Sequence, residues 1–134
     1  HQQPAIAGFC LALDLAISGD EDRGLRKSAD TFCILGPWLT TADDAPDPAS
    51  LTLELEVAGQ LRLQGRVADQ PFTPPQVVAY ASRFVSLRPG DVILAGCPAP
   101  SIGVGPGESL RARAGGLGEM RVRVLPAGTD LSRP

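Results

Sequence analysis

The chain has 134 residues, of which 43% are hydrophobic and 20% charged, with a formal net charge of −3. These values are typical of one soluble globular domain with its own hydrophobic core, so we expect residues 1–134 to form a single domain. The arginines are scattered, without a basic patch, and the longest apolar run, residues 5–17, is too short for a membrane span. We therefore expect neither nucleic acid nor a membrane as a partner.

The first third of the chain predicts two strands joined by a polar connection. Residues 5–13 are almost continuously apolar, as in a buried strand, and residues 18–26 are polar. Residues 30–43 predict a second strand that is broken at Gly36-Pro37, because proline cannot donate to a strand ladder.

Residues 51–67 alternate between apolar and polar side chains, which predicts a β-hairpin with one buried face. The turn is placed at Ala58-Gly59. The residues expected on the buried face are Leu51, Leu53, Leu55, Val57, Leu61 and Leu63.

Residues 73–87 predict the main helix. Thr73 is a good N-cap, Pro74 takes the first helical position, and Gln76 completes a capping box. The apolar side chains then recur at helical spacing and should form one stripe, comprising Val77, Val78, Ala81, Phe84 and Val85.

The last third predicts a short buried strand, a long loop and a second hairpin. Residues 92–96 are the strand, residues 97–109 are a loop rich in glycine and proline, and residues 110–124 are a hairpin in which arginine alternates with apolar residues. We expect these arginines on a solvated face. The loop either brings main-chain N–H groups close to a ligand or is a surface loop without one. The fold class is thus β-rich α+β with one main helix.

The cysteine and histidine content limits the chemistry that this chain can perform alone. Cys10, Cys33 and Cys97 are odd in number and have no Cys-x-x-Cys spacing, so we expect free, mostly buried thiols in a reducing cytoplasm. The one histidine is His1, at a terminus, which leaves no Ser–His–Asp or Cys–His arrangement.

Asp14 and Lys27 are the residues most suggestive of chemistry. Asp14 lies inside an apolar run, so its carboxylate either binds a cation, a metal or main-chain N–H groups, or simply ends the strand. Lys27 is the only lysine among the twelve Lys and Arg residues. If the connection folds back over the strand end, its ammonium group reaches Asp14 and could bind a substrate oxygen or transfer a proton.

Several blocks occur in an order that resembles a known enzyme family. They include "GFCLALD", "LRKSADTFCILGPWLTTAD", "LTLELEVAGQLR", "PPQVVAYASRFVSLRPGDVILAGCP" and "VGPGESLRARAGGLGEMRVRV". From about residue 5 to residue 125, the chain resembles the C-terminal catalytic region of the fumarylacetoacetate hydrolase family. Among its branches, the bacterial hydroxymuconate-type isomerases and decarboxylases of catechol degradation are the most similar.

The resemblance implies a mixed β-sandwich roll, usually dimeric, that acts on a small 2-oxo acid or acylpyruvate. The implied reactions are C–C hydrolysis, decarboxylation or keto–enol isomerisation through a metal-stabilised enolate, with Mg²⁺ or Mn²⁺. By position, Asp14 corresponds to a metal-binding carboxylate and Lys27 to the lysine that contacts metal-bound water or substrate. Gly96 and Cys97 fall in the substrate-binding loop, and Ser18 stands at the position of a substrate-binding arginine.

The chain also departs from the family pattern. The family's Glu-x-Glu metal ligands and its catalytic histidine lie before the matched region, so the resemblance implies a domain that lacks the family's N-terminal segment. Ser18 replaces the usual arginine, Ala16 a serine or threonine, and Cys97 a threonine.

Three functional hypotheses follow. The first is a metal-dependent enzyme, either a homodimer or a chain whose missing residues a partner supplies. The second is an altered member without metal, recruited as a cyclase-type catalyst or a non-catalytic subunit. The third is a protein–protein module without a small-molecule site.

Overall fold

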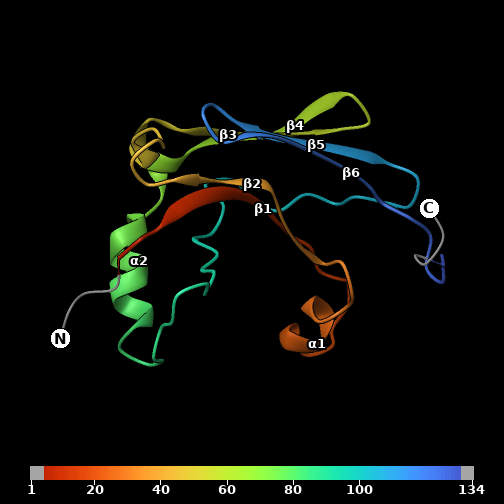
Figure 1. Cartoon of the computed structure of the whole chain (residues 1–134). Coiled ribbons are helices and arrows are strands. Elements are labelled where there is room, and N and C mark those ends of the chain that lie inside the picture. Colours follow the sequence, from red (N-terminus) through yellow and green to blue (C-terminus); the bar gives the residue numbers. More distant parts are fainter. Residues whose placement is uncertain (1–4, 131–134) are drawn as a thin grey trace.

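The computed structural model describes residues 5–130, and these residues form two packed layers of strands with both helices below them (Figure 1). The layers are a two-stranded sheet in the order β1-β2 and a four-stranded sheet in the order β4-β3-β5-β6, both antiparallel. The strands are β1 (Gly8–Asp14), β2 (Cys33–Thr41), β3 (Thr52–Val57), β4 (Gln60–Arg66), β5 (Ser109–Ala114) and β6 (Gly118–Arg123). The helices are α1 (Arg23–Lys27) and α2 (Pro74–Ala81), with 3₁₀ turns at Pro48–Ser50 and Val67–Asp69. The predicted strand-rich α+β class is confirmed.

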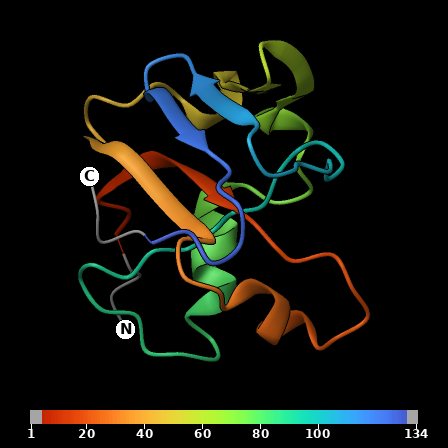
Figure 2. The ribbon, with the colours of Figure 1, turned by 90° about the vertical axis from the view of Figure 1, so that its right-hand side faces the viewer.

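The hydrophobic core lies between the two sheets, where the inward side chains of β1, β3, β5 and β6 meet. Leu110 on β5 is 1% exposed and Val57 on β3 is 2% exposed. The rest of the buried cluster is Leu11, Leu13, Leu51, Ala112, Ala114, Leu117 and Met120. Alternation along each strand produces this arrangement, because every second side chain points to the same face. Turned by 90°, the molecule shows the β1–β2 pair below the larger sheet (Figure 2).

The β3–β4 hairpin is confirmed, with a two-residue turn at Ala58 and Gly59, whose φ angles are 49° and 80°. Such angles are typical of the type I′ turn that fits the twist of a hairpin. The placement of Leu61 on the buried face is wrong, since this side chain is 50% exposed. A register shift between Leu55 and Glu56 sets Leu61 opposite Glu56, so Leu61 shares the outer face with that glutamate.

Gly36-Pro37 does not break β2, contrary to the prediction. The peptide between them is cis, and the strand continues to Thr41 with a register irregularity opposite Phe9–Leu11. A bulge accommodates the proline, because residues within it need no ladder hydrogen bond.

The main helix begins as predicted and ends earlier. Thr73 precedes it, Pro74 is its first residue, and the Thr73 N–H donates to Gln76 Oε1 at 2.8 Å. The helix stops at Ala81 instead of Leu87, so Phe84 and Val85 lie beyond it and are 70% and 55% exposed. No residue of α2 is buried, so the predicted apolar stripe has no core to pack against among the described residues.

Two further predictions are corrected. The polar connection 18–26 contains the start of α1, which Asp22 caps by accepting hydrogen bonds from Gly24 N and Leu25 N. The buried strand predicted at residues 92–96 is absent: the segment is irregular, and Val92 and Leu94 are exposed. Within residues 5–130 its main chain forms no ladder hydrogen bonds, although Ile93 is partly buried.

Candidate functional site

Asp14 is the last residue of β1, where the strand leaves the core. Leu11 and Leu13 point inward and are buried, whereas Asp14 is exposed and lies opposite Cys33 of β2. Its carboxylate is therefore at the open end of the two-stranded sheet, where a polar group costs little to hold.

The short helix α1 brings Lys27 back to this strand end. Its C-terminal turn is tied to the loop after β1, because Arg26 Nε donates to the Ile17 carbonyl at 2.7 Å and Ile17 N donates to the Arg26 carbonyl at 3.0 Å. Lys27 Nζ then donates to the Asp14 carboxylate in a hydrogen-bonded ion pair. The two side chains are 29% and 44% exposed, so a small molecule can reach both charges.

Gly96 and Cys97 lie in a different place, a shallow pocket that they share with Asp69, Gln70 and Pro98. Gln70 Nε2 donates to the Ala95 carbonyl at 3.2 Å and so holds the loop against the 3₁₀ turn Val67–Asp69. Asp14, Lys27 and Ser18 do not line this pocket, and Ser18 is exposed in the connection before α1. The structure thus joins Asp14 to Lys27 without joining them to Gly96 and Cys97 in one cavity.

All three cysteines are free, but the prediction that they are mostly buried is wrong. Cys10 is partly buried, and Cys33 and Cys97 are exposed.

The residues present do not form a complete metal site. Within residues 5–130, no group of three His, Cys, Asp or Glu side chains could hold a metal ion. Divalent cations such as Mg²⁺ take several oxygen ligands, whereas this strand end offers Asp14, whose carboxylate is already paired with Lys27.

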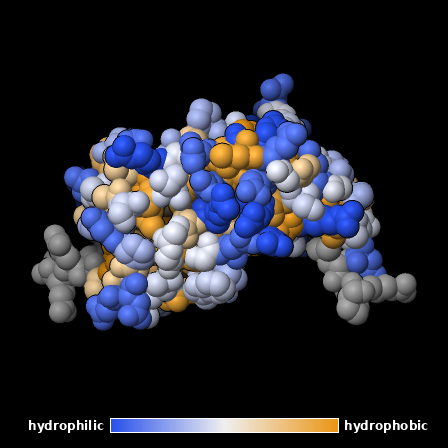
Figure 3. Space-filling model, turned by 90° about the horizontal axis from the view of Figure 1, so that it is seen from above, coloured by the Kyte–Doolittle hydropathy of each residue, from blue (hydrophilic) through white to orange (hydrophobic). Residues whose placement is uncertain are grey.

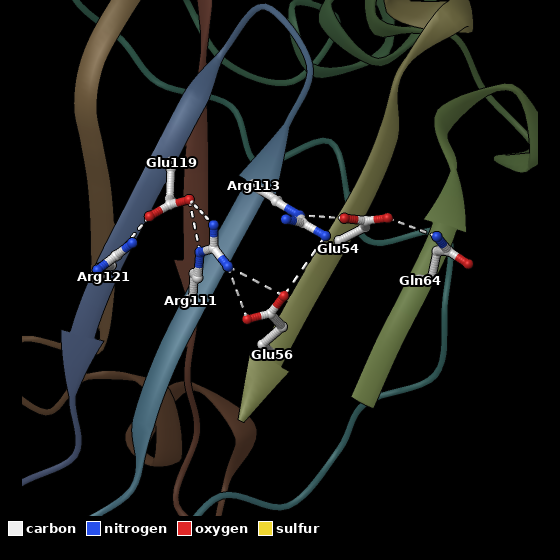
Figure 4. A network of polar contacts seen from close by, with 7 residues as sticks. All are labelled: Glu54, Glu56, Gln64, Arg111, Arg113, Glu119 and Arg121. Atoms are coloured by element: carbon white, nitrogen blue, oxygen red, sulfur yellow. Dashed lines mark hydrogen bonds and ion pairs between the residues drawn. The ribbon is translucent and has the colours of Figure 1, made fainter. Parts of the chain in front are cut away.

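A network of charged residues covers the outer face of the four-stranded sheet (Figure 4). Three carboxylates, Glu54, Glu56 and Glu119, face three guanidinium groups, Arg111, Arg113 and Arg121. The strand register causes this pattern, because Glu54 lies opposite Arg113 and Glu56 opposite Arg111. Sequence reasoning placed the arginines on a solvated face correctly but did not pair them. The pairs could have been predicted from the alternating glutamates in residues 54–56 and the alternating arginines in residues 111–113.

The network lowers the pKa of two carboxyl groups, those of Glu119 and Glu54. A hydrogen bond from Arg111, and then one from Arg121, lower the pKa of Glu119 from 4.5 to about 2. The Arg113 side chain likewise lowers the pKa of Glu54.

Viewed from above, the molecule has a mixed surface in which hydrophilic residues surround smaller apolar areas (Figure 3). Since the charges balance within the network, we interpret it as a structural clamp between strands.

Comparison with known proteins identifies the family. Residues 3–125 match the family described as fumarylacetoacetate (FAA) hydrolase C-terminal. The chain belongs to the fumarylacetoacetate hydrolase family. The family predicted from the sequence blocks is thereby confirmed.

Relatives of known name lie in the branch predicted from the sequence. The chain is 37% identical over 119 residues to maleylpyruvate hydrolase from Aquipseudomonas alcaligenes, a match that covers 89% of this chain and 42% of that protein. A maleylpyruvate hydrolase structure from Sphingobium sp. SYK-6, in complex with manganese(II) and pyruvate, superposes with a TM-score of 0.82 at 39% identity. That match covers 89% of this chain and 44% of the other. A 2-hydroxyhepta-2,4-diene-1,7-dioate isomerase from Mycobacterium marinum superposes with a TM-score of 0.74 at 31% identity, over 81% of this chain and 42% of the isomerase.

The chain spans about half the length of the curated relatives that it matches. No helix within residues 5–130 is long and apolar enough to cross a membrane.

Proposed function

We propose that this chain forms part of an enzyme that acts on a small 2-oxo acid or an acylpyruvate, by C–C hydrolysis, decarboxylation or keto–enol isomerisation. The observation that carries the proposal is the Lys27–Asp14 ion pair at the open end of β1, inside the region that matches the family. The hydrolase and isomerase names of the similar proteins support the substrate class.

In this proposal Lys27 is the catalytic residue. Its ammonium is a compact charge with three donors, one of which Asp14 accepts. The remaining donors can bind an oxo or carboxylate oxygen of the substrate and stabilise negative charge that develops there. Asp14 acts as a positioning residue, because it fixes the direction of the ammonium group.

The loop at residues 96–97 supplies a second contact in the proposal. Gly96 has φ of 90° and lacks a side chain, so the main chain there stays open to a ligand in the shallow pocket. We assign Gly96 and Cys97 to the substrate carboxylate or oxo group, and Ser18 to the rim of the site.

In this proposal, Mg²⁺ or Mn²⁺ is bound by residues that lie outside the described part of the chain. A similar structure binds manganese, but Asp14 alone does not form such a site here. We therefore propose that further site residues come from an additional polypeptide segment, either in a homodimer or from a partner chain.

A second candidate function has its own support. Ser18 stands where the family resemblance implies an arginine, and residues 5–130 contain no cluster of three metal ligands. Both features favour a member whose original site has changed, used as a cyclase-type catalyst without metal or as a non-catalytic subunit.

Turnover measurements separate the two candidates. The purified protein is assayed with oxaloacetate and with an acylpyruvate, with Mn²⁺, with Mg²⁺ and with EDTA, alone and mixed with the part of the Sphingobium maleylpyruvate hydrolase that this chain does not match. The first candidate predicts metal-dependent turnover, at least in the mixture. No bound metal and no turnover under any of these conditions would contradict it and favour the altered member.

A further inference from the structure

The loop of residues 95–98 is fixed to the rest of the fold at its two ends. At the first end, Gln70 Nε2 donates to the Ala95 carbonyl at 3.2 Å. At the second end, Pro98 lies directly on strand β4 at Gly65. A Cβ atom at position 65 would be 2.8 Å from Pro98 Cγ and 3.0 Å from the Pro98 carbonyl oxygen. The two residues assigned to the substrate carboxylate or oxo group lie between these contacts.

Few other interactions fix this loop. Within residues 5–130, the main-chain hydrogen bonds of turns and loops include none to or from residues 92–104. The next residue after Pro98 that packs against the core is Ile102. The contacts of Gln70 and Pro98 therefore determine where the main chain of Gly96 lies relative to the shallow pocket that it lines.

Gly65 permits the contact with Pro98 because it has no side chain. It lies opposite Leu53 of β3, which packs against the core, so position 65 is on the inner face of the four-stranded sheet. Its φ angle is not left-handed, so other residues could adopt its backbone conformation. Glycine inside a strand lowers stability and often marks the close approach of another main chain. Here the main chain that approaches is that of Pro98.

We propose that Gly65 is a positioning residue: the absence of a side chain lets Pro98 rest on β4, and this contact sets the position of Gly96 and Cys97. The role of the loop in binding substrate rests on the proposed function, whereas its position does not. A methyl group at position 65 would push Pro98 away from β4 and displace the loop from the pocket.

The variant Gly65→Ala tests the proposal through the loop and through the substrate. In the proton–nitrogen NMR spectrum of the chain, the amide signals of Gly96 and Cys97 should move. Kinetics are measured in the mixture with the part of the Sphingobium maleylpyruvate hydrolase that this chain does not match, with Mn²⁺ added. There, KM for an acylpyruvate should rise about tenfold while kcat changes much less, because the lost contacts hold the substrate before and during the reaction alike.

Two further variants control the experiment. Gly115→Ala changes a glycine in the β5–β6 turn whose φ is also not left-handed, but a Cβ atom there would meet no heavy atom of a non-adjacent residue within 4 Å. It should leave the loop amide signals and KM unchanged. Pro98→Ala removes the ring that rests on β4 and should also raise KM. The double variant should raise KM by less than the product of the two single effects, because both act on one contact.

Loop position and turnover are separate readouts, so this inference and the proposed function can fail independently. Unmoved amide signals in Gly65→Ala, moved signals with an unchanged KM, or an equal response of Gly115→Ala would overturn the inference. Moved signals in a protein that turns over no acylpyruvate would support the positioning role of Gly65 and contradict the proposed function. If Gly65→Ala loses the circular dichroism spectrum of the unchanged chain, Pro98→Ala provides the same two readouts without a clash, and the same outcomes decide.

Discussion

Lys27 is the residue on which the proposed chemistry depends most. Lys27→Arg keeps the positive charge and allows an ion pair with Asp14, but it replaces a compact ammonium by a planar, wider group. We expect kcat for an acylpyruvate to fall at least about tenfold, because the donors no longer meet the reacting oxygen. Steady-state kinetics check this result. An arginine variant with unchanged kcat would show that charge alone is required at this position.

The lowered pKa of Glu119 predicts how the stability of the fold depends on pH. Its pKa in the folded chain is about 2, below the ordinary 4.5. A lowered pKa means that the stabilisation is present above about pH 4.5 and is lost as the pH falls toward 2. Glu119→Gln should therefore reduce the difference in unfolding free energy between pH 5 and pH 2, as measured by urea denaturation.

A matched control for Glu119 is available on the surface. Glu21→Gln changes an exposed glutamate in the connection before α1 and should leave the pH dependence as it is in the unchanged chain. If Glu119→Gln also leaves it unchanged, the ion pairs with Arg111 and Arg121 do not stabilise the fold.

At the scale of residues, the sequence predicted the contact between Asp14 and Lys27 but not the ion-pair network. A carboxylate in an apolar run and a solitary lysine were sufficient to select Asp14 and Lys27, and the structure places them in contact. The pairing depended on α1 folding back, which residues 18–26 do not reveal, because their polar pattern is also that of a loop. The ion-pair network required strand register, which sequence alternation does not fix by itself.

Among the elements, the β3–β4 turn contains a residue in an unfavourable conformation. Ala58 has φ of 49°, a left-handed conformation that costs an L-residue with a Cβ roughly 1 kcal/mol. Ala58→Asn creates the Asn-Gly pair preferred in type I′ turns and should raise the unfolding free energy by about 0.5–1 kcal/mol. Urea denaturation measures this change. A destabilised Ala58→Asn variant would contradict the assignment of the turn.

Strand β5 lies in the core, so we expect the fold to tolerate the truncation of an inward side chain there poorly. Leu110→Ala removes a side chain that is 1% exposed between the two sheets and should cost about 2–5 kcal/mol. Leu61→Ala, at a position that is 50% exposed, should cost less than about 0.5 kcal/mol. The comparison tests the bulge directly, because without it Leu61 would belong to the buried face. Similar losses for both variants would contradict the register.

Two of the segments that sequence reasoning misjudged, residues 92–96 and the end of α2, share a physical cause. The hairpins were predicted correctly because their alternation and turn residues act locally. Residues 92–96 and the end of α2 have apolar patterns that imply burial, but burial requires a partner that residues 5–130 do not supply. A pattern of hydrophobicity predicts which face needs a cover, and it does not say whether the cover is present.

For the whole molecule, the family and the strand-rich fold are established, and the activity is proposed. The two-layer sandwich holds the Lys27–Asp14 pair at one strand end.

The most direct test of the central claim is the kcat/KM of the Lys27→Ala variant for an acylpyruvate, relative to the unchanged protein, in the complex with the unmatched part of the Sphingobium enzyme and with Mn²⁺ added. Removal of a group that acts on the reacting atoms typically costs about 10²–10⁴ in rate. We predict a loss of at least about 100-fold with an unchanged circular dichroism spectrum. Full activity of the Lys27→Ala variant would contradict the assignment of Lys27 and of the site around it.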